Sequence, residues 1–168
     1  HGFHATFMCR PSLPNLFSSC WHLHQSLVNR SDGQNAFMPH DDTSSLSPLG
    51  TQFLAGLLHH APAACLLTTP TINGYKRYKP FTLAPDRIAW GNENRGAMLR
   101  VIGGPHDSAT RIENRVGDPA ANTNLYLGSQ IIAGLSCIDQ ALHPGVATET
   151  PYESPATAMP ASLMEAIA

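Results

Sequence analysis

Two histidines and a serine alternate along one short segment of the chain. The segment Trp-His-Leu-His-Gln-Ser-Leu-Val (21–28) alternates apolar with polar residues, which predicts a half-buried strand. Every second side chain of a strand shares a face, so His22, His24 and Ser26 would point the same way. Two imidazoles and a hydroxyl suit a metal ion or a phosphate group. The alternative is a pair of ordinary histidines at the surface or at the edge of the core.

A second alternating segment carries a carboxylate between two arginines. In Arg-Ile-Glu-Asn-Arg the same period of two places Arg111, Glu113 and Arg115 on one face. The guanidinium groups would keep the carboxyl ionised, so that it can bind a hard cation while the arginines hold anionic oxygens. The alternative is a salt-bridged face turned to solvent. Charged residues make up only 13% of the chain, about half the usual ~25%, so few charges are available for such a face.

Three more arginines lie in other polar segments. Arg77 belongs to Asn-Gly-Tyr-Lys-Arg-Tyr (73–78), and Arg95 and Arg100 lie at the start of a predicted strand and within it. With the two alternating segments they supply five arginines, one carboxylate and two histidines. That set fits a site that gathers negative charge: a nucleoside triphosphate, its divalent cations and an acidic substrate. The sequence contains no P-loop and no Gly-x-Ser-x-Gly motif.

Short strands and a few longer helices must position these residues. The sequence predicts strands at 4–9, 21–28, 87–90, 97–102 and 110–116, and helices at 51–67, 122–142 and 162–168. Pro62 should kink the first helix. The segments 29–49 and 148–160 are typical of a loop and a linker. Because strands and helices do not alternate strictly, we expect an α+β fold with helices packed on an antiparallel sheet.

Composition excludes several classes of protein. The 168 residues, 42% of them apolar, are about one domain's worth of chain. A net charge of −2 without a basic cluster argues against nucleic-acid binding, and no apolar run is long enough to span a membrane. Four scattered cysteines and no secretory signal indicate a cytoplasmic protein with reduced thiols. Because the chain opens at His1 on a predicted strand, we expect a fragment of a longer protein.

Taken in order, these motifs resemble those of the glutamine synthetase family. The resemblance runs nearly from end to end and covers the C-terminal part of the family's catalytic domain, so 1–168 is identified as a fragment of one such domain. The matching segments are Ala-Thr-Phe-Met-x-Arg-Pro (5–11), His-x-His-Gln-Ser-Leu (22–27), Phe-Leu-Ala-Gly-Leu-Leu-x-His-Ala-Pro-Ala (53–63), Asn-x-Tyr-Lys-Arg (73–77), Trp-Gly-x-x-Asn-Arg (90–95), Arg-Ile-Glu-x-Arg (111–115), Asp-Pro-Ala-Ala-Asn (118–122) and Ala-Gly-Leu-x-x-Ile (133–138).

The resemblance implies an ATP-dependent ligase. Members of the family join the γ-carboxylate of glutamate to ammonia or another amine through a γ-glutamyl phosphate, with Mg²⁺ or Mn²⁺ as cofactor. They form homo-oligomeric rings in which a neighbouring subunit completes each site. The family's other metal-binding glutamates and its N-terminal domain precede the matched segment, so we expect this chain to be inactive by itself.

The resemblance also implies a role for each residue of the candidate site. His22 and Glu113 would be metal ligands, and Arg95 would be catalytic, lying over the transferring phosphoryl group. The residues expected to contact ATP are His24, Gln25, Ser26, Arg95, Arg100 and Arg111. Those expected to hold glutamate are Arg77, Arg95 and Arg115.

Three departures from the family pattern affect the function. Phe-Ser-Ser-Cys (17–20) replaces a glycine-rich stretch whose backbone lies against glutamate, so Cys20 would crowd that approach. Ser108 replaces a lysine that contacts phosphate. Leu83 stands where ammonia-using members carry an acidic residue that helps to bind and deprotonate ammonium. A leucine can do neither, which favours a γ-glutamyl amide or polyamine synthetase.

Two other functions remain open from the sequence. The departures at Cys20, Leu83 and Ser108 also fit a non-catalytic, degenerate paralogue or remnant. A metal-dependent β-barrel oxygenase could use His22, His24 and Glu113 as a facial triad, but it would leave the arginines without a role. The ligase hypothesis requires that His22 and Glu113 lie close enough to share a cation site.

Overall fold

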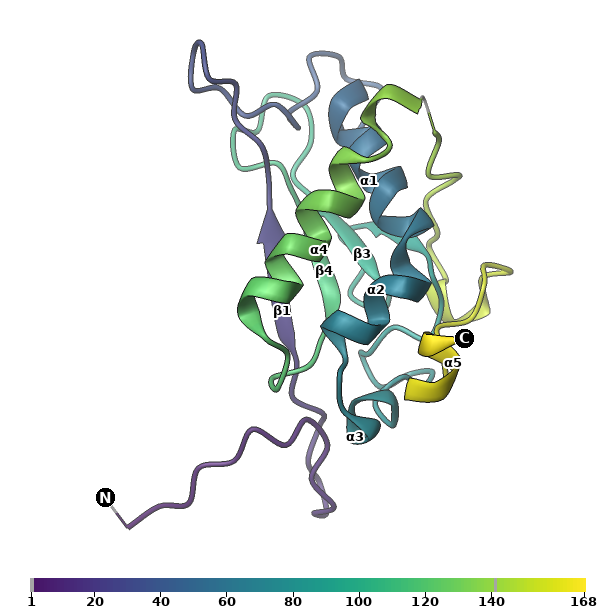
Figure 1. The fold of residues 1–168 in the computed structure, drawn as a ribbon. Coiled ribbons are helices and arrows are strands. Elements are labelled where there is room, and N and C mark those ends of the chain that lie inside the picture. The colour runs from purple at the N-terminus through teal and green to yellow at the C-terminus, as the bar shows by residue number, and fades with distance from the viewer. Residues whose placement is uncertain (1, 141) are drawn as a thin grey trace.

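The computed structural model describes residues 2–140 and 142–168 and contains one four-stranded sheet (Figure 1). The strand order is β1-β4-β3-β2. β4 pairs antiparallel with both β1 and β3, whereas β2 and β3 run parallel, so the sheet is mixed rather than antiparallel. The strands are β1 (Trp21–Gln25), β2 (Trp90–Asn92), β3 (Leu99–Ile102) and β4 (Arg111–Gly117).

Helices cover one face of this sheet. In Figure 1, α1, α2 and α4 lie in front of the strands as one layer. This arrangement confirms the predicted α+β class. The helices are α1 (Pro48–His59), α2 (Ala61–Thr68), α3 (Ile72–Tyr75), α4 (Thr123–Leu135) and α5 (Leu163–Ile167), with short 3₁₀ turns η1 (Ile138–Gln140) and η2 (Pro151–Glu153). None of the helices within the described ranges is long and apolar enough to cross a membrane.

Helix boundaries follow local chemistry. The Ser47 hydroxyl accepts a hydrogen bond from the Gly50 amide and caps α1, and the Asn122 side chain caps α4 in the same way. The single kinked helix predicted at 51–67 is instead two helices that separate at His60. Pro62 lies in the first turn of α2, where its missing amide hydrogen costs no hydrogen bond.

The core lies between the sheet and the helix layer. Leu99, Val101 and Ile112 alternate along β3 and β4 and are buried against α1 residues such as Phe53. α1 and α4 approach closely where both carry glycine. A Cβ atom added at Gly56 would collide with the carbonyl oxygen of Ala133. Glycine at this crossing therefore sets the distance between the two helices.

Several predicted elements differ from the structure. Residues 4–9 form no strand, although the Cys9 carbonyl accepts a hydrogen bond from the Ser19 amide. The predicted strand 87–90 is reduced to an isolated bridge at Arg87 before β2. α4 ends at Leu135 rather than at 142, and residue 141 lies outside the described residues. Residues 93–98 loop back before β3 starts, which makes β2 and β3 parallel.

Candidate active site

The candidate residues gather on the sheet face that the helices leave uncovered. His24 on β1 lies opposite Glu113 on β4, and Glu113 lies opposite Arg100 on β3. Side chains at paired positions share a face, so three strands contribute to one row. His22, Arg111 and Arg115 flank this row on their own strands. The alternation that fills the core with apolar residues on one side thus collects charged residues on the other.

Glu113 is the centre of this face. It is only 2% exposed, and its Oε1 lies 2.7 Å from His22 Nδ1. Arg115 Nη1 donates to Oε1 at 3.0 Å, and Arg100 Nη1 donates to Oε2 at 3.2 Å. Burial raises the pKa of the carboxyl, but the His22 hydrogen bond and the charge of Arg115 outweigh it and lower the pKa to about 2. The carboxylate is therefore ionised at neutral pH.

His22 also contacts Cys20, a neighbour that the sequence did not assign to it. Cys20 Sγ lies 2.7 Å from His22 Nε2, on the other side of the ring from Glu113. The hydrogen bonds with Cys20 and Glu113 raise the pKa of His22 despite its burial. Burial alone would raise the pKa of Cys20. The hydrogen bond to His22 and the nearby cationic groups have the larger effect, so the pKa of Cys20 lies below its ordinary value. The sequence offered one indication of this contact, because residues two apart on a strand share a face.

His24 is held by Arg111. Arg111 Nε donates to His24 Nδ1 at 3.1 Å, so that this nitrogen acts as an acceptor. His24 Nε2 faces Glu113 Oε1 at 3.7 Å. Burial and the charge of Arg111 lower the pKa of His24, against the pull of Glu113. The imidazole is therefore neutral at neutral pH, and its exposed edge can donate or accept hydrogen bonds.

Arg77 and Arg115 are among the arginines with buried hydrogen-bond donors that have no partner in the described part of the chain. Arg77 is 1% exposed, and one of its nitrogens donates to the Val116 carbonyl. Arg115 Nη2 donates to the Leu83 carbonyl at 3.2 Å. Within the described part of the chain, Arg77 Nε and Nη1 and Arg115 Nε have no partner. Both charges influence Cys20, which places both guanidinium groups near its thiol. Buried guanidinium donors without partners are suited to carboxylate oxygens.

Three predicted residues are not part of this network. Gln25 lies on the helix side of the sheet, where its Nε2 is 3.5 Å from Gln130 Oε1 on α4. Ser26 is exposed just beyond the end of β1. Arg95 is exposed in the loop between β2 and β3, and it lines a cavity of about 380 Å³ together with Leu83 and the segment 149–153.

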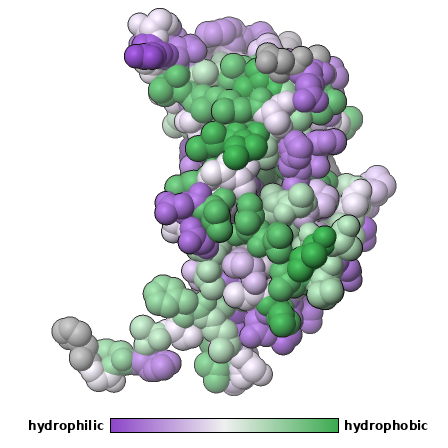
Figure 2. Space-filling model, in the orientation of Figure 1, coloured by the Kyte–Doolittle hydropathy of each residue, from purple (hydrophilic) through white to green (hydrophobic). Residues whose placement is uncertain are grey.

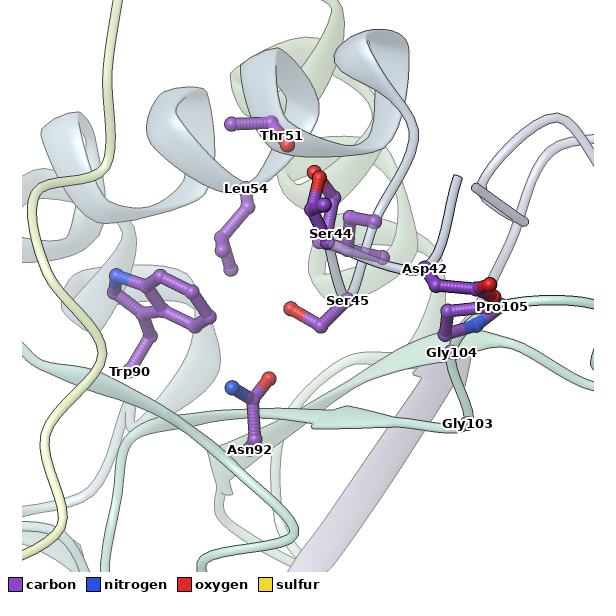
Figure 3. A pocket seen from close by; sticks show the side chains of 12 residues that line it. Asp42, Ser44, Ser45, Thr51, Leu54, Trp90, Asn92, Gly103, Gly104 and Pro105 are labelled. Atoms are coloured by element: carbon purple, nitrogen blue, oxygen red, sulfur yellow. The ribbon is translucent and has the colours of Figure 1, made fainter. Parts of the chain in front are cut away.

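A second cavity lies away from these residues. It holds about 510 Å³ between α1, the segment 42–46 and the edge formed by β2 and the residues after β3 (Figure 3). Trp90 forms one wall, and Ser44, Ser45 and Asn92 supply polar groups. None of the candidate site residues lines this cavity.

The described residues supply part of a cation site. Across 2–140 and 142–168, no group of three or more His, Cys, Asp or Glu side chains could hold a metal ion. His22 and Glu113 offer a nitrogen and an oxygen donor at adjacent positions. Divalent cations of the Mg²⁺ and Mn²⁺ type require more oxygen ligands than this pair provides.

Comparisons with known proteins identify relatives of this chain. A γ-glutamylanilide synthase from Acinetobacter sp. is 48% identical over 169 residues, which cover 99% of this chain and 33% of that protein. A glutamine synthetase from Halobacterium salinarum is 44% identical over 154 residues, which cover 91% of this chain and 33% of that protein. The chain thus spans about a third of the length of these relatives.

A solved structure shares the fold. The structure titled "Apo GmaS without ligand" superimposes with a TM-score of 0.81 at 32% sequence identity, covering 96% of this chain and 37% of that one. The family model described as "Glutamine synthetase, catalytic domain" matches residues 1–168. The chain belongs to the glutamine synthetase family and forms part of its catalytic domain.

Proposed function

We propose that the protein containing this chain joins the γ-carboxylate of glutamate to an amine and uses ATP to do so. The observation that carries the proposal is the ionised, buried Glu113 between His22, Arg100 and Arg115 on one uncovered sheet face. Phosphoryl transfer needs fixed positive charge around the phosphate and an anchored substrate rather than covalent participation of the protein. This face provides such groups on rigid strands.

Each group on this face would have a separate task. The unpartnered donors of Arg77 and Arg115 would hold carboxylate oxygens of glutamate. Arg100, Arg111 and the neutral His24 would contact the nucleotide, since their side chains share the row with Glu113. The exposed Arg95 would reach the phosphoryl group as it moves between the two substrates. The opposite orientation of Gln25 argues against a direct contact with ATP.

The pair of His22 and Glu113 fits one part of a Mg²⁺ or Mn²⁺ site. One such cation would neutralise phosphate charge when bound. The described residues hold no set of three donors, so the other ligands would come from outside them. We propose that they come from other parts of the longer protein, which assembles as a homo-oligomer.

The amine is proposed to be organic rather than ammonium. A carboxylate at position 83 would attract an ammonium ion and remove its proton, but this chain has Leu83 there. One relative carries the name γ-glutamylanilide synthase, which describes an amide with an organic amine. Leu83 lines the cavity that also contains Arg95, and its carbonyl holds Arg115. Position 83 therefore lies next to the groups that would hold glutamate.

The test uses the natural protein that carries this chain, at the full length of its reading frame. It is incubated with ATP, Mg²⁺, glutamate and a panel of amines, and the release of ADP and the mass of the γ-glutamyl product are measured. Glu113→Gln should lower kcat/KM by about 10²–10³-fold, because one central charge is removed. Glu165→Gln on α5 is the matched control and should retain activity.

Two results would overturn the proposal. Wild-type protein that forms no amide with any amine would favour the non-catalytic paralogue. Undiminished turnover of Glu113→Gln would show that the charge at the centre of the sheet face does not serve the reaction.

A further inference from the structure

A pocket opens beside the charged sheet face and has apolar walls. Its volume is about 380 Å³, and Phe81, Leu83, Pro151 and Tyr152 form its apolar walls. The polar residues of the lining are Asn94, Arg95, Glu149, Thr150 and Glu153. The Phe81 and Tyr152 rings lie 5.1 Å apart between centroids, tilted by 50°. At this separation the two rings pack favourably on each other and form one aromatic wall. The pocket is therefore suited to a flat apolar group.

The two loop residues of the pocket are held in an unusual way. Phe81 is 79% exposed and Leu83 is 57% exposed. Both have positive φ angles, 60° and 59°. Large non-glycine residues seldom adopt this conformation, and such strain concentrates at binding sites. The loop thus presents two apolar side chains to the pocket at a conformational cost.

One hydrogen bond links the pocket lining to the proposed reaction site. Arg115 donates one hydrogen bond to the Leu83 carbonyl and another to Glu113. On the other side, Gly96 follows Arg95 and packs tightly on Tyr152, because a Cβ atom at this glycine would lie 3.0 Å from the ring. The wall at Leu83 therefore contacts Arg115, which is proposed to hold glutamate. The wall at Tyr152 lies next to Arg95, which is proposed to contact phosphate.

We infer that this pocket binds the amine co-substrate and selects an aromatic primary amine. The inference rests on the proposed function and specifies its amine. Alkylamines are cationic at neutral pH and need a base, whereas an arylamine is already neutral and can bind without a carboxylate at position 83. Leu83 and Phe81 would contact the aryl ring, and Arg95 would lie near the leaving phosphate. Apolar and aromatic walls that also carry polar groups are the usual environment of such ligands.

The chemical step that the pocket serves is an acyl transfer. The amine nitrogen attacks the γ-carbonyl carbon of γ-glutamyl phosphate, so a C–N bond forms. The bond from that carbon to the phosphate oxygen breaks, and phosphate leaves with the electron pair. The nitrogen loses one proton, which passes to the departing phosphate. The products are the γ-glutamyl arylamide and inorganic phosphate, and no further reactant is needed.

The first experiment measures amine preference in the natural full-length protein. Initial rates with aniline, methylamine and ammonium are compared at saturating ATP and glutamate. We expect aniline to have the highest kcat/KM. Leu83→Glu should lower kcat/KM for aniline on the order of 10²-fold relative to ammonium, because a carboxylate would be desolvated against the ring. Thr82→Glu is the matched control: it adds the same charge one residue away from the pocket lining.

The second experiment measures binding without turnover. Fluorine NMR follows 4-fluoroaniline added to the full-length protein in the absence of ATP. We expect a bound signal that Phe81→Ala weakens about tenfold or more, since that substitution removes one aromatic wall. Circular dichroism of Phe81→Ala checks that the protein remains folded, and Val146→Ala, at an exposed site outside the pocket lining, is a second reference.

The outcomes separate this inference from the proposed function. A preference for ammonium or methylamine, or equal effects of Leu83→Glu and Thr82→Glu, would overturn the aryl pocket while leaving the ligase intact. If no amine is ligated, the proposed function fails, and the NMR experiment still decides whether the pocket binds an arylamine. Absence of 4-fluoroaniline binding, or binding unaffected by Phe81→Ala, overturns the inference in either case.

Discussion

At the scale of single residues, Glu113 determines how the charged face is built. Its carboxylate pairs with His22 on β1, Arg100 on β3 and Arg115 on β4. Period-two alternation was sufficient to predict that Arg111, Glu113 and Arg115 share a face. The same alternation places Gln25 opposite His24, and the structure has it there. The predicted ATP contact of Gln25 followed the family resemblance instead of the geometry of the strand.

Removal of the Glu113 carboxylate should destabilise the folded chain. Glu113→Ala would leave Arg100 and Arg115 without their shared partner in a buried setting, at a cost of about 3 kcal/mol in the free energy of unfolding. Urea titration followed by circular dichroism measures this change. Glu149→Ala, at an exposed position, should stay within about 0.5 kcal/mol of wild type. Equal midpoints for the two variants would contradict the prediction.

Cys65 should make stability depend on alkaline pH. Burial raises the pKa of this thiol to about 12 from 9.0, although the charge of Arg77 opposes the shift. The folded state therefore keeps the proton that the unfolded chain releases above pH 9, so stability is present below pH 9 and is lost as pH rises toward 12. The free energy of unfolding of wild type should fall more steeply with pH in this window than that of Cys65→Ala. Parallel slopes would refute this expectation.

At the scale of elements, the sequence predicted where the long helices lie, but it did not predict which strands pair with each other. The local sequence pattern predicted helices at 51–67 and 122–142, and these ranges contain most of α1 and all of α4. Strand pairing depends on distant segments. Residues 4–9 have the composition of a strand but form none, and the parallel pairing of β2 with β3 depends on a loop whose path the sequence does not reveal. The register of β1 on β4, which builds the site, is likewise a tertiary property.

The crossing of α1 and α4 gives a matched pair of glycine substitutions. Gly56→Ala should lower the free energy of unfolding by about 1–3 kcal/mol, because its Cβ would collide with a main-chain carbonyl of α4. Gly128→Ala, in α4 with open space around it, should raise stability by about 0.5–1 kcal/mol through helix propensity. Thermal unfolding of both variants checks the signs. Stabilisation by both substitutions would contradict the close approach described for the two helices.

At the scale of the whole molecule, a large apolar surface remains open. Hydrophobic side chains are prominent on the helix-covered face of the molecule (Figure 2). Leu125, Ile131, Ile132 and Leu135 of α4 are exposed, as are Phe3, Phe7 and Phe17 in the N-terminal segment. Isolated soluble domains rarely leave this much apolar surface uncovered. The chain spans about a third of the length of its relatives, and we propose that further parts of a longer protein would cover this surface.

The 168-residue chain by itself should form no γ-glutamyl amide. Its described residues contain no set of three acidic, His or Cys side chains for a cation, so the phosphate charge would not be neutralised. Incubation of the purified chain with ATP, Mg²⁺, glutamate and aniline, followed by mass spectrometry, tests this expectation. The full-length protein under identical conditions is the reference. Product formation by the short chain would mean that His22 and Glu113 suffice.

The hydrogen bond from Arg115 to position 83 has an evolutionary consequence. It ends on the main-chain carbonyl of Leu83, and every amino acid supplies that atom. A mutation in this codon can therefore exchange the side chain at position 83 while the guanidinium keeps its hydrogen bond. If the proposed amine pocket is correct, new amine preferences would arise by changes in one loop, and the charged sheet face would stay unchanged.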